Sequence, residues 1–347
     1  MKKIIYIILG LFLAVGAIGT VVYNTQAGQD LIFKRVLGVV MNQQAPEVFD
    51  GLRAVVCGSA SPLGNDPNRA QACIGVVTPQ HFFLFDVGAG SVNRARQAGL
   101  PINRIDGVFI THFHSDHIAN LPDINLASWI QGRKTPLKVY GPTGINQVVA
   151  GFNQAYALDQ KYRNAHHGDH LLAPQAGPMQ AHEFDTGVVW QDDLLTITAF
   201  TVEHPPIDPA VGYRIDYGGR SVVVSGDTNA STNLFNAAEN ADVVFHDALS
   251  RTLLDPMIEA STEAQVPVMP QIMQDVIDYH ADSHSIVEGA KQAGVKQLVY
   301  YHLVPVPLNG LAQDMFMRGL PKDIILAHDL QTFDLPKNSQ EIIVHGP

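Results

Sequence analysis

Short apolar runs rich in β-branched and aromatic residues recur from residue 52 onward and predict the strands of the fold. The earlier runs are RAVVCG, ACIGVV, FFLFDVG, GVFITH and LKVYG, and the later ones are LLTITAFTVEH, VGYRIDY, SVVVSGD, DVVFHDA, QLVYYHL and DIILAHD. Helical patterns such as SVNRARQAG and HSIVEGAKQAG lie between several of them. Because each half consists of strands followed by helices, the sequence predicts an α/β fold with two mixed sheets between outer helices.

A different pattern precedes this body. The run IIYIILGLFLAVGAIGTVVY at 4–23 carries no charge and follows Lys2 and Lys3. About twenty such residues can cross a bilayer, so the sequence favours an uncleaved membrane anchor over a cleaved signal. Basic residues stay on the cytoplasmic side, which predicts an exported body in the cell envelope, or a secreted one after cleavage. The expected division is an anchor or signal at 1–27, a linker at 28–50, and a catalytic body at 51–347 with an insert at about 143–193.

Residues that can bind metal ions follow the ends of the predicted strands. Three histidines and an aspartate crowd into the stretch THFHSDH at 111–117, and three further donors end later strands. Loops at the carboxyl ends of strands converge on one edge of a sheet, so we expect these side chains to lie together. The predicted donors are His112, His114, Asp116, His117, His204, Asp227 and His302.

The spacing of these donors indicates two neighbouring ions. His112 and His114 alternate on a nearly extended backbone and would face the same way, whereas Asp116 and His117 follow the turn. His204 can complete the first site, His302 the second, and Asp227 can bridge them. Imidazole and carboxylate without thiolate suit zinc, with manganese or iron as alternatives. Two such ions would convert a bridging water to hydroxide near neutral pH, so the sequence predicts a hydrolase.

The charge balance bears on the partner. The chain has 22 Lys and Arg against 33 Asp and Glu, a formal net charge of −11, and no basic cluster beyond Lys2 and Lys3. Phosphate backbones require basic surfaces, so nucleic acid is expected to be an unlikely partner and a small ester the substrate. A homodimer remains open.

Two cysteines occur, and each lies in or beside a predicted strand. Cys57 is in RAVVCGS and Cys73 in AQACIGVV. In an exported protein they could form one disulfide, and two buried free thiols are the equal alternative.

The motif THFHSDHIANLPD, with the later GYRI, SGDT and YYHLVP, resembles the signature of the metallo-β-lactamase-fold hydrolases. The nearest resemblance is to the branch that holds ribonuclease Z, arylsulfatases and phosphodiesterases, and it spans roughly residues 52–335. It implies a four-layer αββα sandwich and two zinc ions. The ligand sets that it implies are His112, His114 and His204 for one ion and Asp116, His117 and His302 for the other, with Asp227 as the bridge.

The resemblance also implies roles beside the metals. Asp116 and His280 would be the catalytic residues. His280 lies 22 residues before His302, as does the histidine that assists transition-state charge or the leaving group in ribonuclease Z-like enzymes. Asp86, with Gly88 and Gly90 after it, would brace the histidine loop. The resemblance says less about the remaining positions. His246 and Asp247 stand where ribonuclease Z-like proteins carry a His-Glu pair, and their role stays open. His284 is expected to be exposed, and Thr111 and Ser115 are expected to shape the turn.

The substrate is the least specified property. The leading prediction is a dinuclear zinc hydrolase of small phosphodiesters or aryl sulfates. The alternatives are a lactone or carboxylic ester hydrolase, a ribonuclease Z-like endonuclease that processes tRNA 3′ ends, and a non-catalytic membrane-associated binding protein. The insert at 143–193 holds Lys161 and Arg163 as its only Lys or Arg residues and contains HHGDH at 166–170, so it is predicted to be a lid or pocket wall.

Overall fold

The computed structural model describes residues 20, 22–41 and 49–347. The chain divides into two compact units, Met1–Val48 and Phe49–Pro347. Helix α2 (Gln26–Met41) belongs to the first unit and lies largely in the segment predicted to be a linker. All other helices and strands named below belong to the second unit.

The first sheet of this body has eight strands in the order β15-β14-β1-β2-β3-β4-β5-β6. Neighbours are antiparallel from β15 to β3 and parallel from β3 to β6. Its strands are β1 (Gly51–Gly58), β2 (Cys73–Val77), β3 (Phe82–Phe85), β4 (Gly107–Phe109), β5 (Leu137–Gly141), β6 (Met179–Glu183), β14 (Thr332–Pro336) and β15 (Ile343–His345).

The second sheet has seven strands in the order β13-β12-β11-β10-β9-β8-β7. Neighbouring strands are parallel from β10 to β13 and antiparallel from β7 to β10. Its strands are β7 (Gly187–Gln191), β8 (Leu195–His204), β9 (Ile207–Tyr217), β10 (Arg220–Val224), β11 (Val243–Leu249), β12 (Gln297–Val304) and β13 (Ile325–Leu326). Every residue of β10 and β11 is buried, which explains their continuous apolar runs.

Helices cover the outer face of each sheet. The inner faces of the sheets meet in one core that includes Phe109, Tyr213, Phe245 and Phe333. Helices α3 (Ser91–Gln97), α5 (Leu121–Ile130) and α6 (Ile145–His167) pack on the first sheet, and α7 (Thr232–Ala237), α10 (Ser283–Gln292) and α11 (Gly310–Phe316) on the second. The predicted α/β architecture of two sheets between helices is confirmed.

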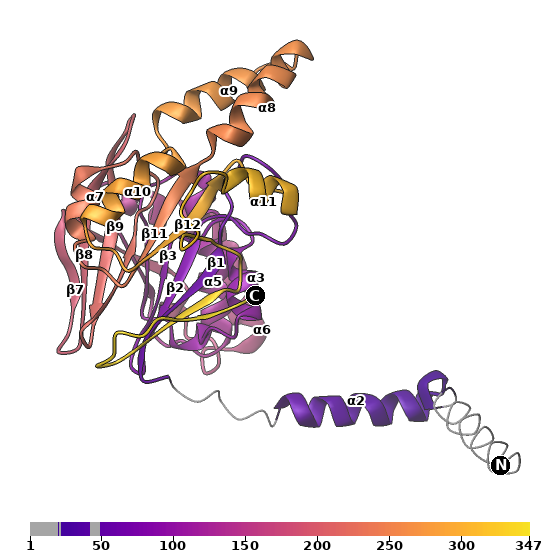
Figure 1. The fold of residues 1–347 in the computed structure, drawn as a ribbon. Helices are drawn as coiled ribbons and strands as arrows, with labels where there is room; N and C mark the ends of the chain where they lie inside the picture. Colours follow the sequence, from indigo (N-terminus) through magenta and orange to yellow (C-terminus); the bar gives the residue numbers. More distant parts are fainter. Residues whose placement is uncertain (1–19, 21, 42–48) are drawn as a thin grey trace, which may run out of the picture. The chain divides into compact units, whose positions relative to one another are not determined.

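Three shorter features complete the second unit. Helix α4 (Ser115–Ile118) follows the histidine motif, and 3₁₀ turns lie at Ile102–Arg104, Pro174–Ala176 and Val276–Asp278. Helices α8 (Arg251–Glu263) and α9 (Met269–Asp275) form a hairpin that rises from the top of the body in Figure 1.

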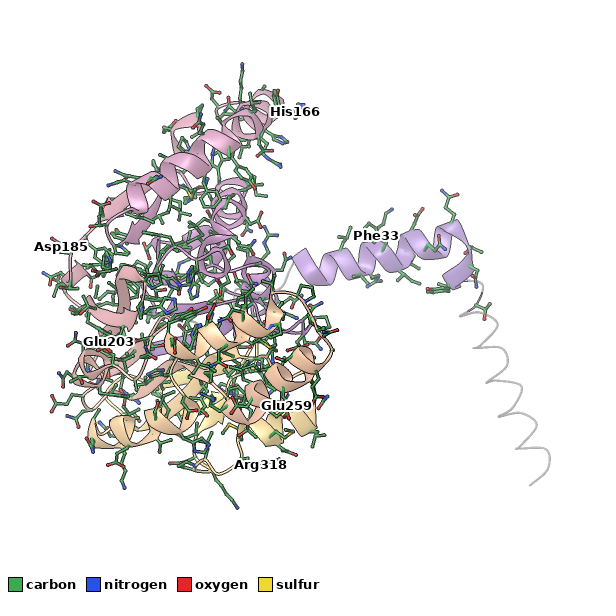
Figure 2. The ribbon with its side chains drawn as sticks, turned by 90° about the horizontal axis from the view of Figure 1, so that it is seen from above. Phe33, His166, Asp185, Glu203, Glu259 and Arg318 are labelled. Carbon is green, nitrogen blue, oxygen red and sulfur yellow. A yellow bond between two sulfur atoms is a disulfide. The ribbon has the colours of Figure 1, made fainter. Side chains whose placement is uncertain are left out.

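The insert at 143–193 contributes to the body of the fold. It contains α6, β6 and β7, and these two strands form an edge of each sheet. Figure 2 shows His166, near the end of α6, at the periphery of the body and far from Glu259 of α8. The strands β6 and β7 carry polar and half-exposed residues, as edge strands commonly do, so the sequence shows no clear strand pattern there.

The structure joins the two cysteines in a disulfide between the end of β1 and the start of β2. Both residues are fully buried. The link closes the base of the loop at 59–72, which contributes Ser61, Pro62 and Leu63 to the cavity described below.

Replacing both Cys57 and Cys73 by alanine should lower the free energy of unfolding. The link spans a sequence separation of 16 residues, and releasing such a loop in the unfolded chain costs about 3 kcal/mol of stability. Urea unfolding of the variant and of the wild type should show this difference. Wild-type protein unfolded with a reducing agent should lose a similar amount, and equal stability in all three measurements would contradict the link.

Candidate metal centre

A buried carboxylate holds the histidine motif in place. Asp86 follows β3 and accepts hydrogen bonds from the backbone N–H of Thr111 and from its Oγ1, both at 2.9 Å. Nδ1 of His117 donates to the same carboxylate at 2.8 Å. This bond places the His117 proton on Nδ1 and leaves Nε2 as the nitrogen that can bind a metal. The predicted bracing by Asp86 therefore has a geometric basis, and Thr111 forms part of it.

Two glycines allow the loops to approach one another. A Cβ on Gly88 would lie 2.1 Å from the carbonyl oxygen of Asp116. Gly226 has a φ of +64°, and a Cβ there would lie 2.8 Å from that of Thr111. Only glycine fits at these two positions: Gly88 lets the loop after β3 approach α4, and Gly226 lets the loop after β10 approach the loop after β4.

The first donor group consists of His112, His114, His204 and Asp227, each offering one atom within 4.8 Å of the others. Nε2 of His112 lies 2.9 Å from Nδ1 of His114 and 3.8 Å from Oδ2 of Asp227. Nε2 of His204 lies 4.0 Å from the same oxygen. The structure brings together the donors that the sequence assigned to the first ion. They come from the loop after β4, the end of β8 and the loop after β10.

The second donor group consists of Asp116, His117, His302 and the shared Asp227, again within 4.8 Å. Nε2 of His117 lies 3.2 Å from Oδ2 of Asp227, and Nε2 of His302 lies 3.0 Å from Oδ2 of Asp116. Asp227 thus lies between the two groups, where a bridging ligand was predicted.

The protonation states on one side of the centre favour metal binding. Burial lowers the pKa of His112 well below its ordinary value, and the neighbouring His117 adds to the effect. Burial also lowers the pKa of His114 and of His204. These histidines are therefore neutral near pH 7, the form that coordinates metals. Nδ1 of His204 donates to the carbonyl oxygen of Tyr279 at 2.9 Å, which leaves its Nε2 for a ligand.

The carboxylates of the centre stay ionised. Burial by itself would raise the pKa of Asp116, but His117 and His302 outweigh it and lower that pKa to about 2. Burial likewise opposes ionisation of Asp227, yet His117 and His302 hold its pKa well below the ordinary range. Both side chains can therefore act as anionic ligands at any physiological pH.

Several buried polar atoms of the centre have no hydrogen-bond partner. They are Nε2 of His117, Nδ1 of His302 and Oδ1 of Asp227. Unpaired polar atoms in a protein interior are costly, and a bound ion satisfies them. The donor set of imidazoles and carboxylates, without thiolate, fits a divalent cation such as zinc.

His280 and Asp247 form a pair beside the metal donors. Nδ1 of His280 donates to Oδ2 of Asp247 at 2.8 Å. The ring of His280 stacks on that of His302 with centroids 5.4 Å apart. Burial by itself would raise the pKa of Asp247, but the adjacent His246 and the hydrogen bond from His280 outweigh it and lower that pKa, so it is a carboxylate. The sequence left the role of Asp247 open, and the structure shows it as the partner of His280.

The other predicted residues lie around the centre. Nδ1 of His246 bonds the backbone oxygen of Asp247 at 2.7 Å, and the buried ring of His246 faces Phe235. His284 and Ser115 are exposed. Sequence reasoning missed Tyr279, which is half-buried and anchors His204 through its backbone. Its position directly before His280 was the available signal.

A cavity of about 300 Å³ opens onto the donors. His114, Asp116, Asp227, His280 and His302 line one part of it. The rest is formed by the loop at 61–63 and by residues 269–279. None of the described residues of the 143–193 insert lines this cavity, so the prediction that the insert forms its lid or wall is wrong.

The matches to known proteins decide the family. The family model described as "Beta-lactamase superfamily domain" matches residues 81–303. A ribonuclease Z from Mycobacterium bovis is 34% identical over 257 residues, which cover 73% of this chain and 86% of the relative. The chain belongs to the metallo-β-lactamase superfamily, in its ribonuclease Z-like branch. A ribonuclease Z from Mycolicibacterium gilvum is 33% identical and covers 76% of this chain and 88% of the relative.

Solved structures of this superfamily share the fold. The metallo-β-lactamase fold protein YhfI from Bacillus subtilis matches with a TM-score of 0.59 and 17% identity, over 82% of this chain and 100% of that one. The short form of human tRNase Z matches with a TM-score of 0.56 and 19% identity, over 82% of this chain and 99% of that one. The predicted family, its metallo-β-lactamase fold and the prediction of a hydrolase are confirmed.

The predicted location in the cell envelope is wrong. The relatives that the chain matches carry the name ribonuclease Z, which is at odds with an exported, membrane-anchored enzyme. Among the described residues, no helix is both long and apolar enough to cross a membrane. The apolar run at 4–23 lies almost wholly outside the described residues, so the structure does not support the predicted anchor helix.

Replacing Asp86 by asparagine should weaken metal binding without touching a ligand. The His117 imidazole would lose its anionic partner, and loss of such a partner commonly costs about 10–100-fold in metal affinity. Competition with a chelator for bound zinc would measure the change. Asp334→Asn is the matched control, because Asp334 is also buried but pairs with Arg53 on β1. Equal zinc affinity in both variants would contradict the bracing role.

Proposed function

We propose that this chain is a metal-dependent phosphodiesterase that cleaves RNA. The observation that carries the proposal is the His280–Asp247 pair, which lies beside two metal-donor groups at a cavity. Its support comes from the relatives named ribonuclease Z, 34% and 33% identical to this chain. Phosphodiester cleavage needs positive charge near the reacting phosphate and a proton for the leaving oxygen, and this arrangement offers both.

His112, His114 and His204 would hold one ion, Asp116, His117 and His302 a second, with Asp227 shared between them. We propose zinc for both, with manganese or iron as alternatives, because the donors are imidazoles and carboxylates. When bound, such ions activate water and neutralise charge that develops on phosphate oxygens. Asp116 would contribute to catalysis as a metal ligand. It lines the same cavity as His280.

His280 would supply the proton. Its Nδ1 donates to Asp247, which leaves Nε2 as the ring nitrogen that can face a substrate. A protonated His280 can give its Nε2 proton to the departing oxygen as the phosphorus–oxygen bond breaks. Asp247 fixes the orientation of the ring and stabilises its positive charge before the transfer. Asp247 is thus a positioning residue, and its shorter side chain still reaches His280.

RNA as substrate revises the expectation that nucleic acid is an unlikely partner. That expectation rested on the net charge of −11, which describes the whole chain. The name of the relatives favours RNA over the small esters and aryl sulfates that were the leading prediction. A small phosphodiester remains the second candidate, because none of the described residues that line the cavity is a lysine or arginine.

Two substrates separate these candidates. A tRNA precursor with a 3′ trailer and bis(p-nitrophenyl) phosphate should be offered to the zinc-loaded protein, with chelated protein as the control. Metal-dependent release of the trailer supports the RNA proposal. Turnover of the small diester alone would favour the second candidate, and hydrolysis of neither, or of sulfate esters instead, would contradict a phosphodiesterase.

His280→Ala should slow diesters with poor leaving groups far more than activated nitrophenyl diesters. A poor leaving group needs the proton, and such assistance contributes about 10²–10⁴-fold, whereas nitrophenolate departs without it. Comparing kcat for alkyl and nitrophenyl diesters measures the difference. His284→Ala, an exposed histidine four residues further on, is the matched control and should behave as wild type. Equal losses on both diesters would rule out the proton-donor role.

A further inference from the structure

The cavity at the metal centre has a second, apolar part that the proposed reaction does not use. Pro62 and Leu63 line it from the disulfide-closed loop, and Met269, Ile272 and Val276 line it from α9 and the turn after it. The metal donors Asp116, Asp227 and His302 are buried, whereas Met269 and Ile272 are 42% and 40% exposed. These methionine and isoleucine side chains therefore form the outer part of the cavity.

The hairpin of α8 and α9 presents this apolar surface in a fixed position. Leu254, Met273 and Val276 are buried and pack with Leu249 and Val304 of the second sheet. This anchoring cluster leaves Met269 and Ile272 outside it, on the cavity. An anchored hairpin with half-exposed apolar side chains beside a reactive centre is typical of a surface that meets a ligand.

The charge of the hairpin excludes one kind of ligand. Residues 251–278 contain one basic residue, Arg251, against five carboxylates, at positions 255, 259, 263, 275 and 278. Phosphates are held by lysine and arginine, and a run of carboxylates repels them. A phosphate backbone therefore has no suitable path along this hairpin, and the apolar side chains of Met269 and Ile272 on the cavity favour an uncharged group over a cation.

We propose that the α8–α9 hairpin is a specificity wall that binds an uncharged flat ring carried by the phosphodiester, next to the reacting phosphate. This inference rests on the proposed phosphodiesterase function and names the group recognised on one side of the ester. A nucleobase and an aryl ring share the required chemistry, since both offer apolar faces and no charge.

Tyr279 gives the wall an aromatic component. It is half-buried, lines the cavity, and lies edge-on to His204 with ring centroids 5.2 Å apart. Its ring thus connects the apolar side chains of α9 with the metal donors. A cavity of about 300 Å³ accommodates one ring of this kind beside a phosphate.

The test uses diesters that share one leaving group and differ in the other substituent. Methyl p-nitrophenyl phosphate has no ring there, bis(p-nitrophenyl) phosphate has an aryl ring, and thymidine 5′-(p-nitrophenyl) phosphate brings a nucleobase. In the double variant Met269→Ala, Ile272→Ala, the kcat/KM preference for the ring-bearing diester over the methyl diester should fall about tenfold. The ring-bearing diester whose kcat/KM advantage falls in the variant shows whether the wall recognises an aryl ring or a nucleobase.

The matched control is Met257→Ala on α8. Met257 is also 42% exposed but does not line the cavity, so the preference should be unchanged. The single variant Ile272→Ala should show a smaller loss in the same direction if the double variant does not fold. Equal losses on all three diesters, or no loss on any, would overturn the inference. An altered oligomeric state in size-exclusion chromatography with unchanged preference would also overturn it, because the hairpin would then serve a second copy.

A binding measurement separates this inference from the proposed reaction. Calorimetry on the zinc-loaded protein should show phenylphosphonate binding tighter than methylphosphonate, and the double variant should lose about tenfold of that difference. If this result holds while no diester is hydrolysed, the phosphodiesterase proposal fails and the ring site stands. If the two phosphonates bind the wild type equally, the ring site fails whatever the activity.

Discussion

The carboxylate of Asp227 is the charge around which the centre is built. It lies at 2% exposure, with Oδ2 3.2 Å from Nε2 of His117 and Oδ1 3.4 Å from Nδ1 of His302. A buried anion is stable only where cations or donors surround it. The imidazoles of the loop after β4, of the end of β8 and of β12 provide that environment, and a divalent ion would complete it. The two sheets therefore bring these segments together around one carboxylate.

Backbone conformations that are uncommon for ordinary residues support this convergence. Asp86 and His302 have positive φ angles of 57° and 45°; Asp86 directly follows β3, and His302 lies within β12 near its end. Such conformations cost about 1–3 kcal/mol each and persist where the surrounding structure imposes them. Here they turn the Asp86 carboxylate toward the histidine loop and the His302 ring toward Asp116. The body of the fold thus stabilises a centre whose local geometry is unfavourable.

The donors that the structure brings together could be proposed from the sequence because their signal is local. His112, His114 and His117 crowd into one turn, and no packing role explains that density. Other properties depend on contacts between distant segments. The pairing of Asp247 with His280 depends on the fold, which brings β11 beside the turn that carries His280. The apolar residues of α9 are indistinguishable from core residues in the sequence. The net charge of −11 and the apolar run at 4–23 led to expectations about partner and location that the ribonuclease Z relatives do not support. Neither feature describes the surroundings of the site.

The central claim is that these strand-end donors hold two divalent ions on either side of Asp227. Crystals of the zinc-loaded protein, measured at wavelengths just above and below the zinc absorption edge, test this claim directly. We expect two anomalous peaks, one bounded by His112, His114 and His204 and the other by Asp116, His117 and His302, with Asp227 touching both. A single peak at one donor group, or zinc bound away from Asp227, would contradict it.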